Sequence, residues 1–355
     1  MPRDRPFDRF RAGPQASSVE LWCEDALAGL PRRLAPGSVD VVVTSPPYNR
    51  RMPYRTYRDH RPRAEYLEWM AGFGRSVDRV LAERGSFFLN VGGSPSDPWL
   101  PYDVAREAGR PFVLQNVLHG VKSIAIDRTA AGRATGLDRD LALGHYKPLV
   151  SERYVHGALE YVFHFSRRGD VAIDRLAIGV PYQDKSNVRR WRAGGDRRCR
   201  GNTWFLPYPT IRYAVRDRPH PATFPPELPE WCFRLHGVLR IRRALDPFVG
   251  IGSSAVAAVR LGVPFVGFDV DPGYLATTRE RVRRLDGAPR GRRTPATRPD
   301  SARRQAPGRN GRPATSPPAG GAPRPSGRRR GLPAVAGGPL ARREGGPGVT
   351  GFVPP

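Results

Sequence analysis

The chain has 355 residues, a formal net charge of +26, and 39 residues each of glycine and proline. Its three cysteines lie far apart without Cys/His ligand spacing, which argues against a disulfide framework and a zinc site. No segment approaches the roughly 18 apolar residues of a membrane span, and no export signal is visible, so we expect a cytoplasmic protein.

The two ends of the chain differ in composition from its middle. Residues 1–18 are polar and predict a mobile arm, whereas residues 287–355 are mostly Arg, Pro, Gly and Ala and predict a disordered basic tail. The tail holds 14 arginines and two acids, so it accounts for +12 of the net charge and leaves +14 on residues 1–286. That surplus favours a polyanion as partner, although a solvated basic surface is an alternative for the tail.

Residues 19–286 alternate between strand-like and helix-like segments. Short β-branched or apolar runs predict strands at 19–23, 39–44, 85–92, 113–126, 159–165 and 264–269. Apolar residues at helical spacing predict helices at 26–33, 65–83, 255–261 and 273–285, with another that ends near residue 236. Because a helix that joins two strands makes a right-handed crossover, we expect a single α/β domain around a mainly parallel sheet.

The motif Ser45-Pro46-Pro47-Tyr48 follows the predicted strand at 39–44. Two prolines remove two N–H donors and stiffen the turn, so the carbonyls and the serine hydroxyl form a fixed set of acceptors beside the tyrosine ring. Such acceptors suit the exocyclic NH2 of a nucleobase, whose ring could stack on Tyr48. An ordinary proline-rich turn is the alternative for the tetrapeptide taken alone.

A second motif runs from Asp246 to Ser253, and its Gly250 and Gly252 would let the backbone approach a ligand closely. The next predicted strand ends in Asp269, which could accept hydrogen bonds from two ribose hydroxyls. A dinucleotide site is disfavoured because the Gly-x-Gly-x-x-Gly pattern is interrupted by Ala255.

These motifs resemble those of the amino-group DNA methyltransferases. Ser-Pro-Pro-Tyr resembles their catalytic motif, in the serine form that is commoner in cytosine-N4 enzymes, and Asp-Pro-Phe-x-Gly-x-Gly-Ser resembles their S-adenosylmethionine motif. The catalytic motif precedes the cofactor motif, as in the circularly permuted β group. The resemblance covers about residues 19–285 and implies a Rossmann-like, S-adenosylmethionine-dependent methyltransferase fold.

The resemblance also implies which residues form the site. The catalytic positions are Ser45, Pro46, Pro47 and Tyr48. The cofactor-binding positions are Asp25, Thr223, Phe224, Asp246, Phe248, Gly250, Gly252, Ser253 and Asp269. The family has Gly-Asp-Ala where this chain has Glu24-Asp25-Ala26, and a helix cap is the alternative role for Asp25.

Two basic, aromatic segments are candidates for contact with DNA. One is the loop 49–63, beside the proposed site, and the other is the interval 166–218, where the resembling family tends to place target recognition. The candidate DNA-binding residues are Arg50, Arg51, Arg55, Lys185, Arg189, Arg190, Arg197 and Arg198. An ordinary insertion that covers the edge of the sheet is the alternative for 166–218.

The histidines His145, His156 and His164 have irregular spacing, so we expect hydrogen-bonded loop or strand residues and no metal. The expected reaction is methyl transfer from S-adenosylmethionine to N4 of cytosine at a specific sequence in double-stranded DNA, with a restriction endonuclease as a candidate companion. Adenine N6 is the alternative target. A noncatalytic DNA-binding protein is the alternative of another class.

Overall fold

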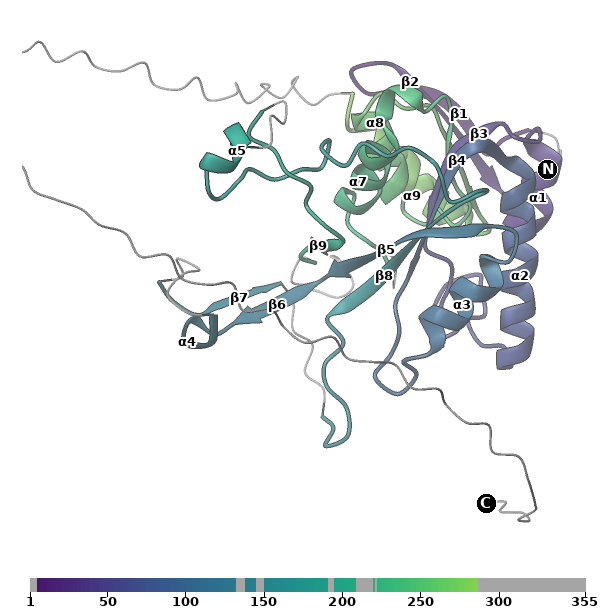
Figure 1. Cartoon of the computed structure of the whole chain (residues 1–355). Coiled ribbons are helices and arrows are strands. Elements are labelled where there is room, and N and C mark those ends of the chain that lie inside the picture. The colour runs from purple at the N-terminus through teal and green to yellow at the C-terminus, as the bar shows by residue number, and fades with distance from the viewer. Residues whose placement is uncertain are drawn as a thin grey trace, which may run out of the picture. The chain divides into compact units, whose positions relative to one another are not determined.

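The computed structural model describes residues 5–131, 138–144, 150–190, 195–208, 220 and 222–286. The chain divides into two units, Met1–Arg293 and Thr294–Pro355. The predicted tail, 287–355, lies outside the described residues, so the fold is that of the first unit (Figure 1). No helix within these ranges is long and apolar enough to cross a membrane.

A nine-stranded mixed sheet forms the centre of this unit, in the order β1-β2-β11-β10-β3-β4-β8-β5-β9. The strands from β2 through β11, β10 and β3 to β4 are all parallel, whereas β1 and β8 run antiparallel to their neighbours. A separate hairpin pairs β6 with β7. The strands are β1 (Asp8–Ala12), β2 (Ser17–Cys23), β3 (Val39–Thr44), β4 (Leu81–Val91), β5 (Val113–Val121), β6 (Ser123–Ile126), β7 (Leu141–Gly144), β8 (Leu159–Ser166), β9 (Thr203–Phe205), β10 (Ala244–Asp246) and β11 (Phe265–Asp269).

Helices cover both faces of the sheet (Figure 1). One buried cluster joins the sheet to α7, α8 and α9, and the other joins it to α1, α2 and α3. The helices are α1 (Ala26–Arg33), α2 (Arg63–Val80), α3 (Leu100–Ala108), α4 (Arg128–Ala131), α5 (Ser186–Arg190), α7 (Glu227–His236), α8 (Ser253–Arg260) and α9 (Pro272–Arg283), with a 3-10 turn η2 (Val238–Arg240). The predicted α/β architecture with a mainly parallel sheet is confirmed.

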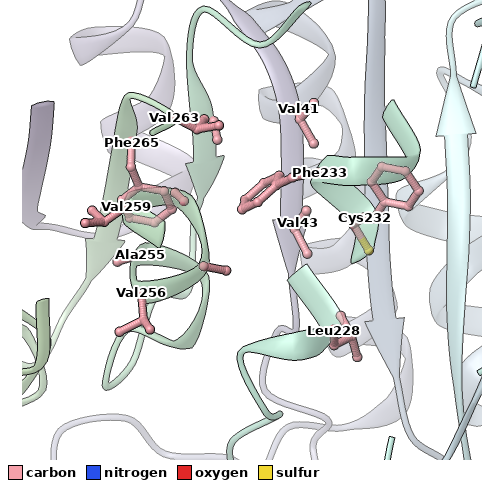
Figure 2. Close-up of a cluster of buried hydrophobic side chains, with 14 of the residues drawn as sticks. Val41, Val43, Leu228, Cys232, Phe233, Ala255, Val256, Val259, Val263 and Phe265 are labelled. Atoms are coloured by element: carbon pink, nitrogen blue, oxygen red, sulfur yellow. The ribbon is translucent and has the colours of Figure 1, made fainter. Parts of the chain in front are cut away.

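Strand β3 is buried on both faces, as its β-branched run predicts. Val41 and Val43 pack into the cluster with α7 and α8 that Figure 2 shows, and Val42 packs into the opposite cluster. Because successive side chains of a strand point to opposite faces, this alternation anchors β3 from both sides. Each buried valine stabilises the fold by roughly 1.5–3 kcal/mol relative to exposure, and the turn after Thr44 therefore starts from a rigid strand.

The prediction of a mobile arm over residues 1–18 is wrong for its second half. Residues Asp8–Ala12 form edge strand β1, and its partner β2 begins at Ser17. Phe10 and Ala12 face the core with a period of two, while Arg9 and Arg11 are exposed. The hairpin also reaches the end of α9, where the Gly13 amide donates to the Asp286 carboxylate at 2.5 Å.

Other elements also differ from the predictions. The helix predicted to 83 ends at Val80, because the buried Leu81 already belongs to β4. The single strand predicted at 113–126 is divided at Lys122 into β5 and β6. Helix α3 is absent from the predicted elements, although Leu100, Val104 and Ala108 bury one face at helical spacing.

Candidate active site

The two sequence motifs meet at the carboxyl ends of β3 and β10, which are parallel neighbours. The hydroxyl of Thr44, the last residue of β3, donates a 2.6 Å hydrogen bond to the Asp246 carboxylate at the end of β10. These residues are 202 positions apart in the chain, and the sheet order brings them together. The catalytic and cofactor motifs therefore lie side by side where the parallel strands end.

Ser45 and Tyr48 form a hydroxyl pair directly after β3. The two side-chain oxygens lie 2.6 Å apart, and the Tyr48 hydroxyl also donates to the backbone carbonyl of Asn90 at 3.2 Å. Burial, together with the nearby Glu160 carboxylate, raises the pKa of Tyr48 well above its usual value, so the phenol stays protonated. Within the Ser-Pro-Pro-Tyr turn, the backbone carbonyl of Pro47 accepts a 2.8 Å hydrogen bond from the Tyr66 hydroxyl, which holds the turn against α2.

Asn90 and Glu160 extend this pair into a buried polar cluster that sequence reasoning missed. Asn90 Nδ2 lies 2.8 Å from Glu160 Oε2 and 3.1 Å from the Tyr48 hydroxyl. The hydroxyl of Tyr208 donates to the same glutamate oxygen at 2.9 Å. No local signal marks either residue, because both strands hold other polar side chains; Asn90 near the end of β4 and Glu160 near the start of β8 come together through the antiparallel pairing of these strands.

The glycine turn after β10 adopts the backbone conformation that its sequence requires. Gly250 and Gly252 have φ angles of +51° and +83°, in the left-handed region that favours glycine. A Cβ atom at Gly250 would lie 3.2 Å from the His220 ring, and one at Gly252 would lie 2.5 Å from Thr278. Both glycines are buried, and a side chain would be crowded at Gly250 and would clash at Gly252, so the turn requires glycine at these positions.

Asp269 lies at the end of β11, across from this turn. Its two oxygens accept from the amides of Gly250 and Asp271, both at 2.9 Å. Burial raises the pKa of this carboxyl to about 6. Each oxygen of an ionised carboxylate can accept more than one hydrogen bond, so the position suits a ligand with adjacent hydroxyl groups.

Asp246 instead faces the protein interior. Its side chain is 1% exposed and accepts from Thr44, Ser254 and the Phe248 amide. Burial raises its pKa to about 6, while these hydrogen bonds act in the opposite direction. The carboxylate thus joins β10, β3 and the start of α8 and holds the glycine turn in place.

The remaining predicted cofactor residues lie around this edge. Phe248 packs against Trp69 and Phe73, with ring centroids 5.6 and 5.1 Å apart. Ser253 is buried in the first turn of α8, Thr223 is exposed, and Phe224 is half-buried ahead of α7. Asp25 caps α1 by accepting from the amides of Leu27 and Ala28 at 2.9 and 3.3 Å, which confirms the capping alternative. The adenine contact of Asp25 remains a prediction.

The loop after Tyr48 is ordered by one buried carboxylate. Asp59 is 3% exposed and accepts from the backbone amides of Asn49, Arg50 and Met52 at 2.8 to 3.0 Å. The Asn49 side chain also exchanges two hydrogen bonds with the backbone of Arg61. The loop therefore has a defined path although it contains no helix or strand.

Arg55, a predicted DNA contact, lies in an ion pair with its side chain 56% exposed, and its contact with DNA remains a prediction. Its guanidinium makes a bidentate ion pair with Asp271, at 3.0 and 2.7 Å, and lies 4.4 Å from the centre of the Tyr274 ring. Asp271 is 3% exposed, and a buried carboxylate requires such a partner. Arg55 thus ties the loop to the start of α9.

The other predicted DNA-binding residues are mostly exposed. Lys185 pairs with Asp196 at 2.5 Å, and the side chain of Arg189 lies outside the described residues. Exposed basic side chains are found at Arg50, Arg51, Arg190, Arg197 and Arg198. Within the interval 166–218, β9 pairs with β5 at the edge of the sheet, and the role of the interval in target recognition remains a prediction.

His164 is a hydrogen-bonded strand residue, as expected. Its ring nitrogens lie 3.0 Å from Ser86 Oγ and 3.0 Å from Asn116 Nδ2, and His236 lies 2.9 Å from the same serine oxygen. Burial lowers the pKa of His164 to about 3 and that of His236 to about 4. Both rings are neutral at pH 7. His145 lies outside the described residues.

The mostly parallel sheet, the bare glycine turn and the adjoining Ser-Pro-Pro-Tyr motif define the class of Rossmann-like methyltransferases that modify amines. A profile of the DNA methylase family of N6 and N4 amino-methyltransferases matches residues 39–280, and the chain belongs to this family. S-adenosylmethionine is the methyl donor of the family. The predicted fold, family and cofactor are thereby confirmed.

Individual relatives are distant. The type II methyltransferase M.BglII of Bacillus subtilis is 26% identical over 248 residues, which cover 67% of this chain and 62% of that protein. The type II methyltransferase M.ScaI of Streptomyces caespitosus is 26% identical over 277 residues, covering 74% and 80%. The solved PvuII DNA methyltransferase (cytosine-N4-specific) has a TM-score of 0.52 at 18% identity, covers 78% of this chain and 95% of its own, and shares the fold.

Proposed function

We propose that the protein transfers a methyl group from S-adenosylmethionine to the exocyclic N4 amine of cytosine in double-stranded DNA, at a specific sequence. The observation that carries this proposal is the hydroxyl pair of Ser45 and Tyr48, held beside the cofactor turn by the Thr44–Asp246 hydrogen bond. A serine at this position favours cytosine N4 over adenine N6, because the resembling cytosine enzymes more often have serine here.

The residues on the cofactor side fit S-adenosylmethionine. Gly250 and Gly252 offer bare backbone rather than a phosphate cradle, which matches a sulfonium ligand, and Asp269 offers acceptors for two ribose hydroxyls. We assign Asp25 to a hydrogen bond with the adenine amine of the cofactor, and Thr223, Phe224 and Phe248 to the walls of the cofactor site. Asp246 and Ser253 support the turn from behind. When bound, S-adenosylmethionine supplies an electrophilic methyl group on its sulfonium.

On the substrate side, the flipped cytosine would stack on Tyr48 and donate its two N4 hydrogens to Ser45 Oγ and the Pro46 carbonyl. These hydrogen bonds draw electron density toward a nitrogen that is otherwise conjugated into the ring, and they hold it in line for attack. Pro47 stiffens the turn that presents both acceptors. As the new N–C bond forms, the bond between the methyl group and the sulfonium breaks, and the amine, which becomes positive, releases one proton to solvent.

The exposed basic residues around 50–51 and 185–198 are assigned to phosphate contacts. The relatives M.BglII and M.ScaI are named type II methyltransferases, which supports a sequence-specific DNA substrate and a companion restriction endonuclease.

The test is to incubate the purified protein with labelled S-adenosylmethionine and mixed genomic DNA, digest the DNA to nucleosides, and identify the labelled base. N4-methylcytosine is the expected product. N6-methyladenine would overturn the assignment of the base while retaining the site. DNA that carries no label would instead favour the noncatalytic alternative.

A further inference from the structure

Glu160 is a carboxylate with three donors in the part of the chain that the structure describes. Its side chain is 13% exposed, and Lys122 approaches Oε1 at 3.3 Å. The Tyr208 hydroxyl and Asn90 Nδ2 both donate to Oε2, at 2.9 and 2.8 Å. A surface ion pair would contribute little, but a carboxylate with several donors and little solvent is held in one orientation.

This carboxylate adjoins the catalytic pair. A Cβ atom at Gly92 would lie 3.2 Å from the Tyr48 ring and 3.2 Å from Glu160 Cγ, so only a glycine separates the two side chains. Asn90 bridges them, since its Nδ2 also lies 3.1 Å from the Tyr48 hydroxyl and 3.5 Å from Ser45 Oγ.

Glu160 determines which way the Asn90 amide points. An ionised carboxylate accepts hydrogen bonds and donates none, so the NH2 group of Asn90 must face it. That orientation leaves the buried Oδ1 of Asn90 without a hydrogen-bond partner among the described residues. Leaving a buried acceptor unpaired costs free energy, and such exceptions occur where a function constrains the side chain.

The orientation of Asn90 in turn sets the hydrogen bonds of the catalytic pair. With an N–H of Asn90 directed at Tyr48, the Tyr48 proton goes to the Asn90 backbone carbonyl, and the Ser45 proton goes to the Tyr48 oxygen. This arrangement leaves a lone pair of Ser45 Oγ for the amine of the target base. The negative charge nearby also favours an amine that becomes positive as the methyl group arrives.

We propose that Glu160 is a positioning residue for methyl transfer, which acts through Asn90 on the hydroxyls of Tyr48 and Ser45. The inference deepens the proposed active site and rests on it, but it does not depend on which base is methylated. Because Tyr208 lies in the interval assigned to target recognition, its bond to Glu160 also connects that interval with the catalytic pair.

The test compares Glu160→Gln with the wild type in total methyl transfer to genomic DNA. We expect kcat to fall on the order of tenfold, the strength of a hydrogen bond to a charged group, with little change in KM for DNA or in cofactor affinity. The matched control is Glu83→Gln, which removes a surface ion pair with Arg168 from a side chain that is 60% exposed and should keep the wild-type kcat.

A double-mutant cycle separates positioning from general stabilisation. If Glu160 acts through Asn90, then Glu160→Gln should slow the Asn90→Ala variant no further. Full additivity, or a wild-type kcat in folded Glu160→Gln, would overturn the proposal. If the glutamine variant fails to fold, Glu160→Asp replaces it in the test. The shorter side chain keeps a negative charge near Lys122 but no longer reaches Asn90. A wild-type kcat in Glu160→Asp would likewise overturn the proposal.

Ser45→Ala distinguishes the two levels of inference. If this variant keeps the wild-type rate, the proposed active site itself is wrong. If it is inactive while Glu160→Gln is fully active, only the role of Glu160 is wrong.

Discussion

At the scale of single residues, Ser45 is the group on which the proposed chemistry depends most directly. Its side-chain oxygen is 2.6 Å from the Tyr48 hydroxyl, and the residue directly follows a strand that is buried on both faces. Ser45→Ala removes one acceptor for the target amine and leaves the cofactor turn untouched. We expect methyl transfer to fall by about a hundredfold or more, while cofactor affinity measured by calorimetry stays within error.

Asp269 makes cofactor binding dependent on pH. Its pKa is raised to about 6 by burial, and in the proposed site the ionised form is the one that would accept from two ribose hydroxyls. As the pH falls below about 6 the carboxyl gains a proton, so affinity should fall by up to about tenfold per pH unit. Calorimetric titrations between pH 5 and 8 would measure this change. Asp269→Asn should bind weakly with a flat profile, and a flat wild-type profile would contradict the assignment.

The sequence identifies some of these residues better than others. Ser45 and Asp269 lie in short local motifs, so they could be predicted without knowledge of the sheet order. Glu160 could not, because its role depends on β8 pairing antiparallel with β4. The ion pair of Arg55 with Asp271 could not be predicted either, because the two residues are 216 positions apart, and the DNA contact predicted for Arg55 remains a prediction.

At the scale of elements, one serine joins two strands and a helix. Ser86 of β4 contacts His164 of β8 and His236 at the end of α7. The pKa values of both histidines are lowered by burial, to about 3 and about 4, so the unfolded chain binds protons before the folded one does. Their contribution to stability is therefore present above pH 6.5 and is lost as the pH falls toward 4 and 3.

This linkage can be measured by denaturant unfolding at pH 7 and pH 5. Compared with the wild type, His164→Gln should lose about 2 kcal/mol less stability between these two pH values. The comparison with the variant is needed because Asp246 and Asp269, with pKa values raised from 3.8 to about 6, act in the opposite direction below pH 6. Equal losses in the two proteins would show that His164 does not contribute.

The loop of residues 49–61 is joined to α9 by the Arg55–Asp271 ion pair. Arg55→Ala would leave a buried carboxylate with fewer donors, so we expect a loss of about 1 kcal/mol in unfolding free energy. Susceptibility of the loop to limited proteolysis should also rise. The neighbouring, exposed Arg51 provides the matched control, because Arg51→Ala should weaken DNA binding without affecting stability. If Arg55→Ala weakened DNA binding and left stability unchanged, Arg55 would be a DNA contact and the ion pair would not hold the loop.

At the scale of the whole molecule, charge is divided between the folded unit and the tail. Residues 287–355 hold +12 of the +26, so they can release counterions from DNA even without reading any base. Truncation after Asp286 should reduce the salt dependence of DNA affinity, by about 0.9 in the log–log slope for each phosphate that the tail would otherwise neutralise. Fluorescence anisotropy at several salt concentrations measures the slope, and an unchanged slope would exclude the tail from binding.

The hydrogen bond between Gly13 and Asp286 and the 3.5 Å ion pair between Asp8 and Arg283 place the first strand of the folded unit beside its last helix. A short linker could therefore connect residue 286 to the N-terminal hairpin, and new ends could open at Gly169, beside the exposed Arg168. The rearranged chain would present its cofactor motif before its catalytic motif. Since β10 and β3 would still pair, the same active site should form. The order of the two motifs along the chain would then reflect evolutionary history, because the chemistry does not require it.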